Sequence, residues 1–451
     1  MTPEHLQSLG LAVGLLFLMT LVATRRSRNL SEEDYLVGGR DVPAWPLSAA
    51  IAAGVIGGGV LLVYTEYAFK FGLAALFIIG GITVGTLLMV PVAKKFKSLA
   101  DTQLFYSLPD LYHHFWGRRA GFLATCTVLP WTVGFIIMQL ISAGEIIRSM
   151  TGIPYYVGVI LAASTVASYL LVAGFRAVVI TDIMQYCALL LLLVLVFIPA
   201  AAQVDLHSSF LAAASQSINW PDAIGFFVLG ALNMIVSADM YQRFYAARSE
   251  GHAKRGFWIA AGLVLAAGVL LLVPPLYARS RIPTVEANQA LFRTLNLLLP
   301  KWLLGFGLVG VLATVIACLD TMVFILGIAV GHDLRVRHLK KPIENRLRST
   351  RVTIVVALVA GTILSILFTK LLAVGLALSM LGLVLAPSIV LTVFKKPPSR
   401  RAVEGGLILG LAATAILLCA SLFQPSLLTP ENTLVALAGA VLGTCIGGLF
   451  Q

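Results

Sequence analysis

Long apolar runs separated by short polar segments cover almost the whole chain. Most runs hold about 20 residues, the length that an α-helix needs to cross roughly 30 Å of hydrocarbon. We predict thirteen such helices, at residues 6–24, 44–67, 73–93, 120–147, 154–173, 178–199, 222–241, 257–277, 302–330, 352–369, 372–394, 404–422 and 431–450. Runs of this length exclude a barrel, because its strands are shorter, and lipid tolerates only closed backbone hydrogen bonding. The predicted fold class is therefore an all-α polytopic membrane protein.

The distribution of basic residues predicts how these helices are oriented. The chain is 59% hydrophobic and 12% charged, with a net charge of +12, whereas soluble proteins carry about 25% charged residues. With the N-terminus outside, 25 of the 32 Lys and Arg residues fall in cytoplasmic loops, as the positive-inside rule requires. We expect an integral protein of a bacterial-type inner or plasma membrane with a cytoplasmic C-terminus. The net charge then reflects topology and anionic-lipid contact, not nucleic-acid binding.

The ends and loops of the chain predict a single transmembrane domain over residues 1–451. The first apolar run lacks the preceding positive charge of a signal peptide, so we expect a retained helix. No loop is long enough to fold separately, and we expect no signalling domain after the last span. The five cysteines form no CxxC pair, which argues against a zinc site or a disulfide framework. No His/Glu metal motif or nucleophile elbow is present, so we predict neither an enzyme nor a cofactor.

Glycine is concentrated near the start of the second span. Four of the six residues from Gly54 to Gly59 are glycine, which makes a weak helix. Close packing of neighbouring helices is one explanation. The other is a broken helix that exposes backbone carbonyls near the middle of the membrane.

Four motifs, in order along the chain, resemble those of the sodium/solute symporter family. They are Asp34-Tyr35-Leu36-Val37-Gly38-Gly39-Arg40, the stretch from Gly174 to Gln185, Tyr241-Gln242-Arg243-Phe244-Tyr245 with the basic residues after it, and Asn288-Gln289-Ala290-Leu291. Each is a weak match alone, but together they cover most of the chain and fall on the expected sides of the membrane.

The resemblance implies a LeuT-type fold of five plus five helices in inverted repeat. The repeats would span residues 44–199 and 222–394, with an extra helix at 6–24 before them and two at 404–450 after them. Members of the family couple Na⁺ entry to uptake of a small organic solute. The solute would sit between the broken first and sixth core helices and the third, eighth and tenth.

The resemblance also implies a cation site, which this chain alters. Backbone carbonyls at Ala53 and Ile56, and one at Thr314 on the eighth core helix, would hold Na⁺. The two adjacent hydroxyls that the family supplies are replaced by Ala317 and Cys318. Na⁺ is a hard cation that prefers oxygen, so a methyl and a thiol weaken the site.

Two carboxylates in the spans can compensate for those lost hydroxyls. Asp182 matches a family acid on the fifth core helix, and Asp320 on the eighth is followed by Thr321. A carboxylate within a membrane costs about 2.5–3.5 kcal/mol by insertion scales, and we expect no basic side chain near these two. They can bind Na⁺ directly, share a proton, or contact water at the cytoplasmic mouth.

Polar residues around the expected cavity are candidates for solute contact. They are Gly57 and Gly58 at the break, Gln139 and Ser142 on the third core helix, and Asn233 and Ser237 on the sixth. Each alone is more often a helix-packing hydrogen bond. Because no basic residue is expected in mid-span, a neutral or zwitterionic solute fits better than an anion.

The leading hypothesis is a secondary transporter that carries a solute together with Na⁺ by alternating access. A proton-coupled transporter of the same fold is one alternative. A solute sensor that kept the fold and lost coupling is another, which the altered hydroxyl positions favour.

Overall fold

The computed structural model describes residues 3–26, 31–203, 220–367, 378, 380–424 and 434–449. These residues form helices joined by short links, with one isolated β-bridge between Val42 and Ala247. In chain order the helices are α1 (Pro3–Arg26), α2 (Glu32–Val37), η1 (Gly38–Arg40), α3 (Ala44–Val55), α4 (Gly58–Phe71), η2 (Gly72–Ala75), α5 (Leu76–Thr102), α6 (Leu108–Thr151), α7 (Tyr155–Gln203), α9 (Trp220–Val236), α10 (Ala238–Ala246), α11 (Glu250–Arg281), η3 (Ala287–Gln289), α12 (Ala290–Leu298), η4 (Lys301–Leu303), α13 (Leu304–Ile328), η5 (Ala329–His338), η6 (Ile343–Asn345), α14 (Arg346–Leu367), η8 (Met380–Leu385), α16 (Ala386–Phe394), α17 (Arg400–Phe423) and α19 (Val435–Leu449). The all-α prediction is confirmed.

The number of membrane crossings stays a prediction. Eight described helices, or nine if the bent pair α9–α10 counts as one, are long and apolar enough to cross a bilayer. One of them, α7, contains two of the expected spans, separated at Gly174 by a left-handed backbone (φ +56°). A side chain there would also lie 2.6 Å from the Tyr35 carbonyl oxygen, so only glycine fits. The stretch 368–377, where the expected span at 372–394 begins, lies outside the described residues.

Two helices are interrupted in mid-course, and each begins one of the expected repeats. The first break separates α3 from α4, where Ile56 (φ −86°, ψ 58°) leaves the helical conformation. The second lies at Ser237 between α9 and α10, whose axes differ by 46°. Of the two explanations for the Gly54–Gly59 cluster, the broken helix is therefore observed. Close packing is observed as well, since these glycines lie against neighbouring side chains.

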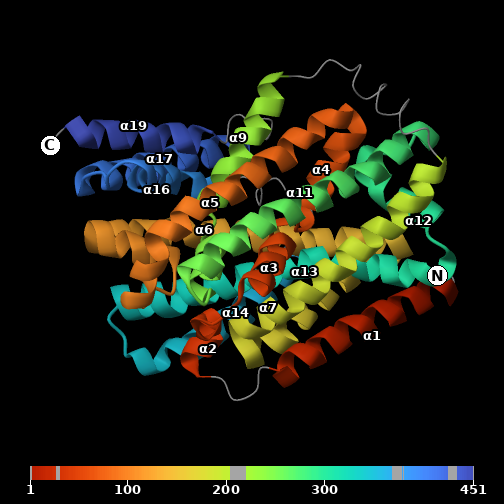
Figure 1. Cartoon of the computed structure of the whole chain (residues 1–451), viewed down its shortest axis with the longest axis horizontal. Coiled ribbons are helices and arrows are strands. Elements are labelled where there is room, and N and C mark those ends of the chain that lie inside the picture. The colour runs from red at the N-terminus through yellow and green to blue at the C-terminus, as the bar shows by residue number, and fades with distance from the viewer. Residues whose placement is uncertain are drawn as a thin grey trace.

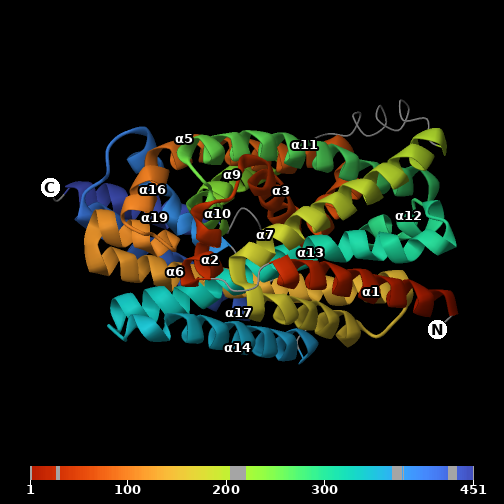
Figure 2. The same ribbon diagram turned by 60° about the horizontal axis from the view of Figure 1, so that its bottom comes forward.

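The central helix of the bundle is α13, which is buried from Gly307 to its end at Ile328. It lies among α3, α6 and α7 in both ribbon views, while α1 runs along the outside (Figures 1 and 2). The last two helices, α17 and α19, pack together at the opposite edge through small residues such as Gly406 and Gly443. This arrangement buries the two breaks, at Ile56 and Ser237, although the first turns of α9 are exposed.

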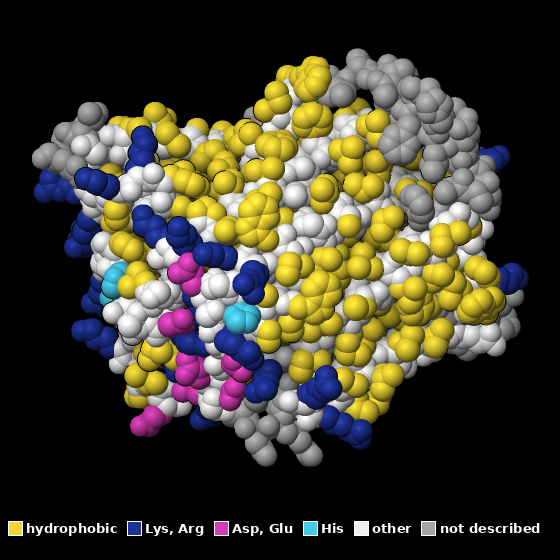
Figure 3. All heavy atoms as spheres, viewed as in Figure 1, with side chains coloured by type: hydrophobic (Ala, Val, Ile, Leu, Met, Phe, Trp, Pro, Cys, Tyr) yellow, Lys and Arg dark blue, Asp and Glu magenta, His cyan; other side chains and the backbone are white. Residues whose placement is uncertain are grey.

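Lys and Arg side chains gather at one end of the long axis, which we call the basic end. It carries α2, the α5–α6 link, η5 and the α16–α17 link, and Figure 3 shows it at the left and lower left, beside a broad apolar surface. The N-terminal end of α1 and the C-terminal end of α19 lie at opposite ends of the molecule (Figure 1). Which end faces the cytoplasm stays a prediction from the charge distribution.

The two interrupted helices are joined near the basic end. Val42, just before α3, accepts a hydrogen bond from the Arg248 amide (3.0 Å) and donates to the Ala246 carbonyl (3.0 Å) at the end of α10. The first half of one interrupted helix is thus fixed to the second half of the other.

We predict that Gly85→Ala destabilises the fold, because the new methyl would lie 2.5 Å from the Ala231 carbonyl oxygen where α5 meets α9. The melting temperature in detergent should fall. The matched control is Gly262→Ala in α11, which has open space and should keep or slightly raise the melting temperature, since alanine favours a helix over glycine by about 0.5–1 kcal/mol. Equal melting temperatures for the two variants would contradict the packing argument.

Candidate functional site

The break between α3 and α4 is lined by residues from α6 and α13. Gln139 accepts a hydrogen bond from the Gly58 amide (2.8 Å), which satisfies one of the donors at the start of α4. A methyl at Gly57 would lie 2.7 Å from Cβ of Cys318, and one at Gly58 would lie 2.7 Å from Cβ of Ser142. The structure therefore brings together five of the residues proposed from the sequence.

The end of α3 offers backbone oxygens at this break. A helix leaves its last four carbonyls without helical partners, and these include the carbonyls of Ala53 and Ile56. Both residues are buried, as are Thr314 and Ala317 on α13. The Thr314 hydroxyl donates to the Val311 carbonyl within its own helix (2.8 Å). Carbonyl oxygens suit a hard cation, and the thiol beside Gly57 adds a poor ligand.

A buried arginine lies next to this break, which the sequence analysis did not expect. Arg243 on α10 is 0% exposed and donates from Nη2 to the Ala50 carbonyl of α3 (3.0 Å). Its guanidinium also lies 3.4 Å from Asp182 and 2.9 Å from Asp239. The expectation that no basic side chain lies near Asp182 is wrong, because residue 243 belongs to a buried half-helix and not to a loop.

The second carboxylate joins the same cluster through hydroxyl groups. Tyr169 of α7 donates to Asp320, and the Thr321 hydroxyl lies 3.2 Å from the other oxygen of that carboxylate. Arg243 Nη2 is 3.4 Å from the same hydroxyl. Asp182 and Asp320 are both fully buried, so contact with water at a mouth does not account for them. We call Asp182, Asp239, Arg243, Asp320 and Thr321 the central charge cluster.

The two candidates on the sixth core helix are placed differently. Ser237 lies at the break between α9 and α10 and donates its hydroxyl to Asp239. Asn233 is half-buried one turn earlier in α9, and no hydrogen bond joins it to the Gly57–Gln139 group in the described residues. Asp239 follows Ser237 in α10 and is buried and paired with Arg243.

A second group of buried polar side chains lies between α6 and η5 at the basic end. Asp110, His332 and Asp333 offer ligand atoms within 4.8 Å of one another, the kind of group that can hold a metal. Arg337, however, contacts Asp110 and lies 3.3 Å from His332 Nε2. The Arg337 guanidinium therefore takes the place that a metal ion would have in this group. We interpret the four residues as an ion-pair network between α6 and η5.

Arg243, Asp239 and Tyr169 belong to the candidate site and were not among the site residues proposed from the sequence. Arg243 was visible as part of the Tyr-Gln-Arg motif, but the predicted span ended at residue 241 and placed it in a loop. Tyr169 is an aromatic residue in an apolar run, and no pattern separates it from its neighbours until its partner Asp320 is known.

Comparison with known proteins places this geometry in context. A model described as the sodium:solute symporter family matches residues 35–413. The osmoregulated proline transporter OpuE of Bacillus subtilis (strain 168) is 23% identical over 442 residues, which cover 92% of this chain and 89% of that protein. A sodium/proline symporter of Staphylococcus aureus is 23% identical over 352 residues, which cover 72% of this chain and 67% of that protein.

A solved structure shares the fold. It is the substrate-bound outward-open state of a Na⁺-coupled sialic acid symporter, which matches with a TM-score of 0.82 and 18% identity over 98% of this chain and 97% of that chain. The predicted fold class is thereby confirmed, and the exact bounds of the two repeats remain a prediction.

We predict that Gly57→Ala abolishes function in a transport assay, since its methyl would strike Cβ of Cys318, which cannot rotate away. Gly59→Ala is the control. Its methyl would meet only the terminal carbon of Met138 (2.9 Å), which can move. Initial uptake rates of both variants, at matched amounts of folded protein, provide the measurement. Uptake by Gly57→Ala at the parental rate would contradict a tight contact between the break and α13.

We also predict that Cys318→Ser increases the apparent affinity for Na⁺, because it restores a hydroxyl oxygen beside the break. The Na⁺ concentration that gives half-maximal uptake should fall several-fold. Cys419→Ser, an exposed position on α17, is the control and should change nothing. An unchanged Na⁺ dependence in Cys318→Ser would mean that no cation lies near this side chain.

Proposed function

The chain belongs to the sodium:solute symporter family, and from this premise we propose that it carries a small neutral or zwitterionic solute with Na⁺ by alternating access at the α3–α4 break. It is an integral membrane protein and a secondary transporter, not an enzyme. We further propose that the basic end faces the cytoplasm and that the N-terminus lies outside.

The observation that carries the coupling proposal is a buried imbalance of charge. The central charge cluster holds three carboxylates, Asp182, Asp239 and Asp320, and one guanidinium, that of Arg243. Within the described residues no other basic side chain forms an ion pair with these carboxylates. When all are ionised, the cluster carries two uncompensated negative charges in a medium that strongly penalises them. The cluster therefore attracts cations.

The ligand atoms of this cluster suit a hard cation such as Na⁺. One oxygen of Asp182 has no hydrogen-bond partner although it is buried. The Thr321 hydroxyl lies near the same Arg243 nitrogen as the other Asp182 oxygen, and the Asp320 carboxylate lies beside that hydroxyl. All of these are oxygen ligands, which hard cations prefer. A proton is the alternative, because buried carboxylates that repel one another can share one.

The solute proposal rests on the start of α4. The N-terminus of a helix carries a partial positive charge, and broken helices in transporters direct such ends at anionic groups of their substrates. The Gly58 amide at this end bonds to Gln139 in this structure, and we propose that the carboxylate of a zwitterion takes the place of the Gln139 oxygen when the solute binds. Proline is the first solute to test, given the proline transporters among the relatives, and sialic acid is the second.

We predict that Asp182→Asn abolishes gradient-driven accumulation while the protein stays folded, because the variant removes one of the charges that attract the coupling ion. Uptake into proteoliposomes should be measured with a Na⁺ gradient, and again with choline replacing Na⁺ at two pH values. Loss of uptake in choline at both pH values supports Na⁺, whereas uptake that persists in choline and follows the pH gradient supports proton coupling.

The control for this experiment is Asp41→Asn, which removes an exposed carboxylate paired with Arg248 (2.6 Å) at the surface. It should accumulate solute like the parent chain. Undiminished accumulation by Asp182→Asn would overturn its coupling role. Binding of solute by the parent chain without any flux would instead identify a sensor that retains the transporter fold.

A further inference from the structure

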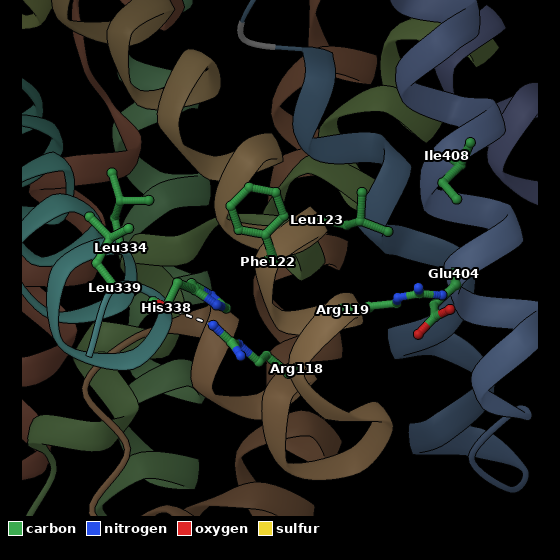
Figure 4. Close-up of a pocket in the computed structure, with 9 residues that line it drawn as sticks. All are labelled: Arg118, Arg119, Phe122, Leu123, Leu334, His338, Leu339, Glu404 and Ile408. Atoms are coloured by element: carbon green, nitrogen blue, oxygen red, sulfur yellow. Dashed lines mark hydrogen bonds between the residues drawn. The ribbon is translucent and has the colours of Figure 1, made fainter.

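A groove of about 670 Å³ opens at the basic end between α6, η5 and α17 (Figure 4). Its walls are mainly apolar side chains from all three elements, with Leu334 and Leu339 on one side and Ile408 on the other. Arg118 and Arg119 lie along its rim, below the ring of Phe122. The groove is separate from the α3–α4 break and plays no part in the transport proposal.

The backbone of α6 places the two arginines at the level where the apolar span begins. Gly117 interrupts the helix with a left-handed backbone (φ +83°) immediately before them, and the predicted span starts at residue 120. Phe122 and Leu123 follow within one turn. A polar rim thus lies at the membrane interface, and the apolar wall extends from it towards the hydrocarbon.

Neither rim arginine forms an ion pair with a carboxylate in the part of the chain that the structure describes, although Glu404 lies near Arg119 (Figure 4). Arg118 donates one Nη2 hydrogen bond to the His338 carbonyl (2.9 Å), and Arg119 forms no hydrogen bond or ion pair with any described residue. The one acid that lines the groove, Glu404, is already paired with Arg400 (2.7 Å). Both rim guanidinium groups therefore remain available to an anion.

The apolar wall is exposed to a degree that suits a lipid chain. Phe122 is 44% exposed, Leu339 58% and Ile408 53%. The Phe122 ring is held in place by an edge contact with the His338 ring, with centroids 5.2 Å apart. An anion without a hydrocarbon tail would use the rim and leave this wall uncovered.

We propose that this groove binds an anionic phospholipid from the leaflet next to the basic end. The phosphate contacts the guanidinium groups of Arg118 and Arg119, which match phosphate oxygens in shape and charge. The acyl chains lie along Phe122 and Ile408. Basic pockets between transmembrane helices are known to hold acidic headgroups in this way.

The test uses the full-length protein, purified in detergent, with bound lipid counted by native mass spectrometry. The probes are phosphatidylglycerol and cardiolipin, with phosphatidylcholine as the zwitterionic comparison and inorganic phosphate as a soluble competitor. Arg118→Gln/Arg119→Gln should weaken binding of the two acidic lipids by about tenfold or more, since each basic residue at a membrane surface contributes about one kcal/mol. Arg255→Gln/Arg348→Gln removes two exposed charges elsewhere at the same end and should leave binding unchanged.

Each other result overturns the proposal. Equal binding of phosphatidylcholine would mean that charge is not recognised. Displacement of the acidic lipids by inorganic phosphate would identify a phosphate site without a lipid component. If the double variant fails to fold, Arg119→Gln alone is the test, because this side chain has no hydrogen bond or ion pair within the described residues. Binding of the acidic lipids by Arg119→Gln at the parental level would then contradict the proposal.

Discussion

A helix can be interrupted inside a bilayer only where other groups replace the backbone hydrogen bonds that it loses. In this protein one replacement comes from a buried side chain on a neighbouring helix, since Gln139 of α6 accepts a hydrogen bond from the Gly58 amide at the start of α4. Arg243 of α10 adds a hydrogen bond to the Ala50 carbonyl inside α3 and so joins α10 to the helix that ends at the break. The interruption and the residues of α6, α10 and α13 that contact it therefore form one packed arrangement.

The same arginine links the backbone of α3 to the carboxylates of the central charge cluster. Its guanidinium contacts a carbonyl of α3, two carboxylates and the Thr321 hydroxyl at once. When the three carboxylates of the cluster are ionised, the single guanidinium leaves an excess of negative charge that a bound cation can neutralise. Because a side chain at Gly54 would collide with this guanidinium, the glycine cluster serves the charge cluster as well as the break.

The sequence predicted the features that follow from hydropathy and from the family motifs. The apolar runs indicated the helices, and the density of glycine between residues 54 and 59 indicated the break that the structure has. Hydropathy failed at α10, because this half-helix carries polar residues yet is covered on all sides by other helices. Polarity along the chain therefore suggested a loop, and only tertiary packing reveals that Arg243 is buried beside Asp182. Roles of Ala53, Ile56 and Thr314 as cation ligands stay predictions, since a carbonyl leaves no signal in a sequence.

The pair of backbone hydrogen bonds at Val42 has a consequence for motion. They fasten α3 to the end of α10, and Arg243 ties the same two half-helices together a second time deeper in the bundle. A rearrangement that pulls one half-helix outward on its own must break both attachments, whereas one that swings the two as a rigid pair breaks neither. These contacts therefore favour movement of α3 and α10 together over movement of either half-helix alone.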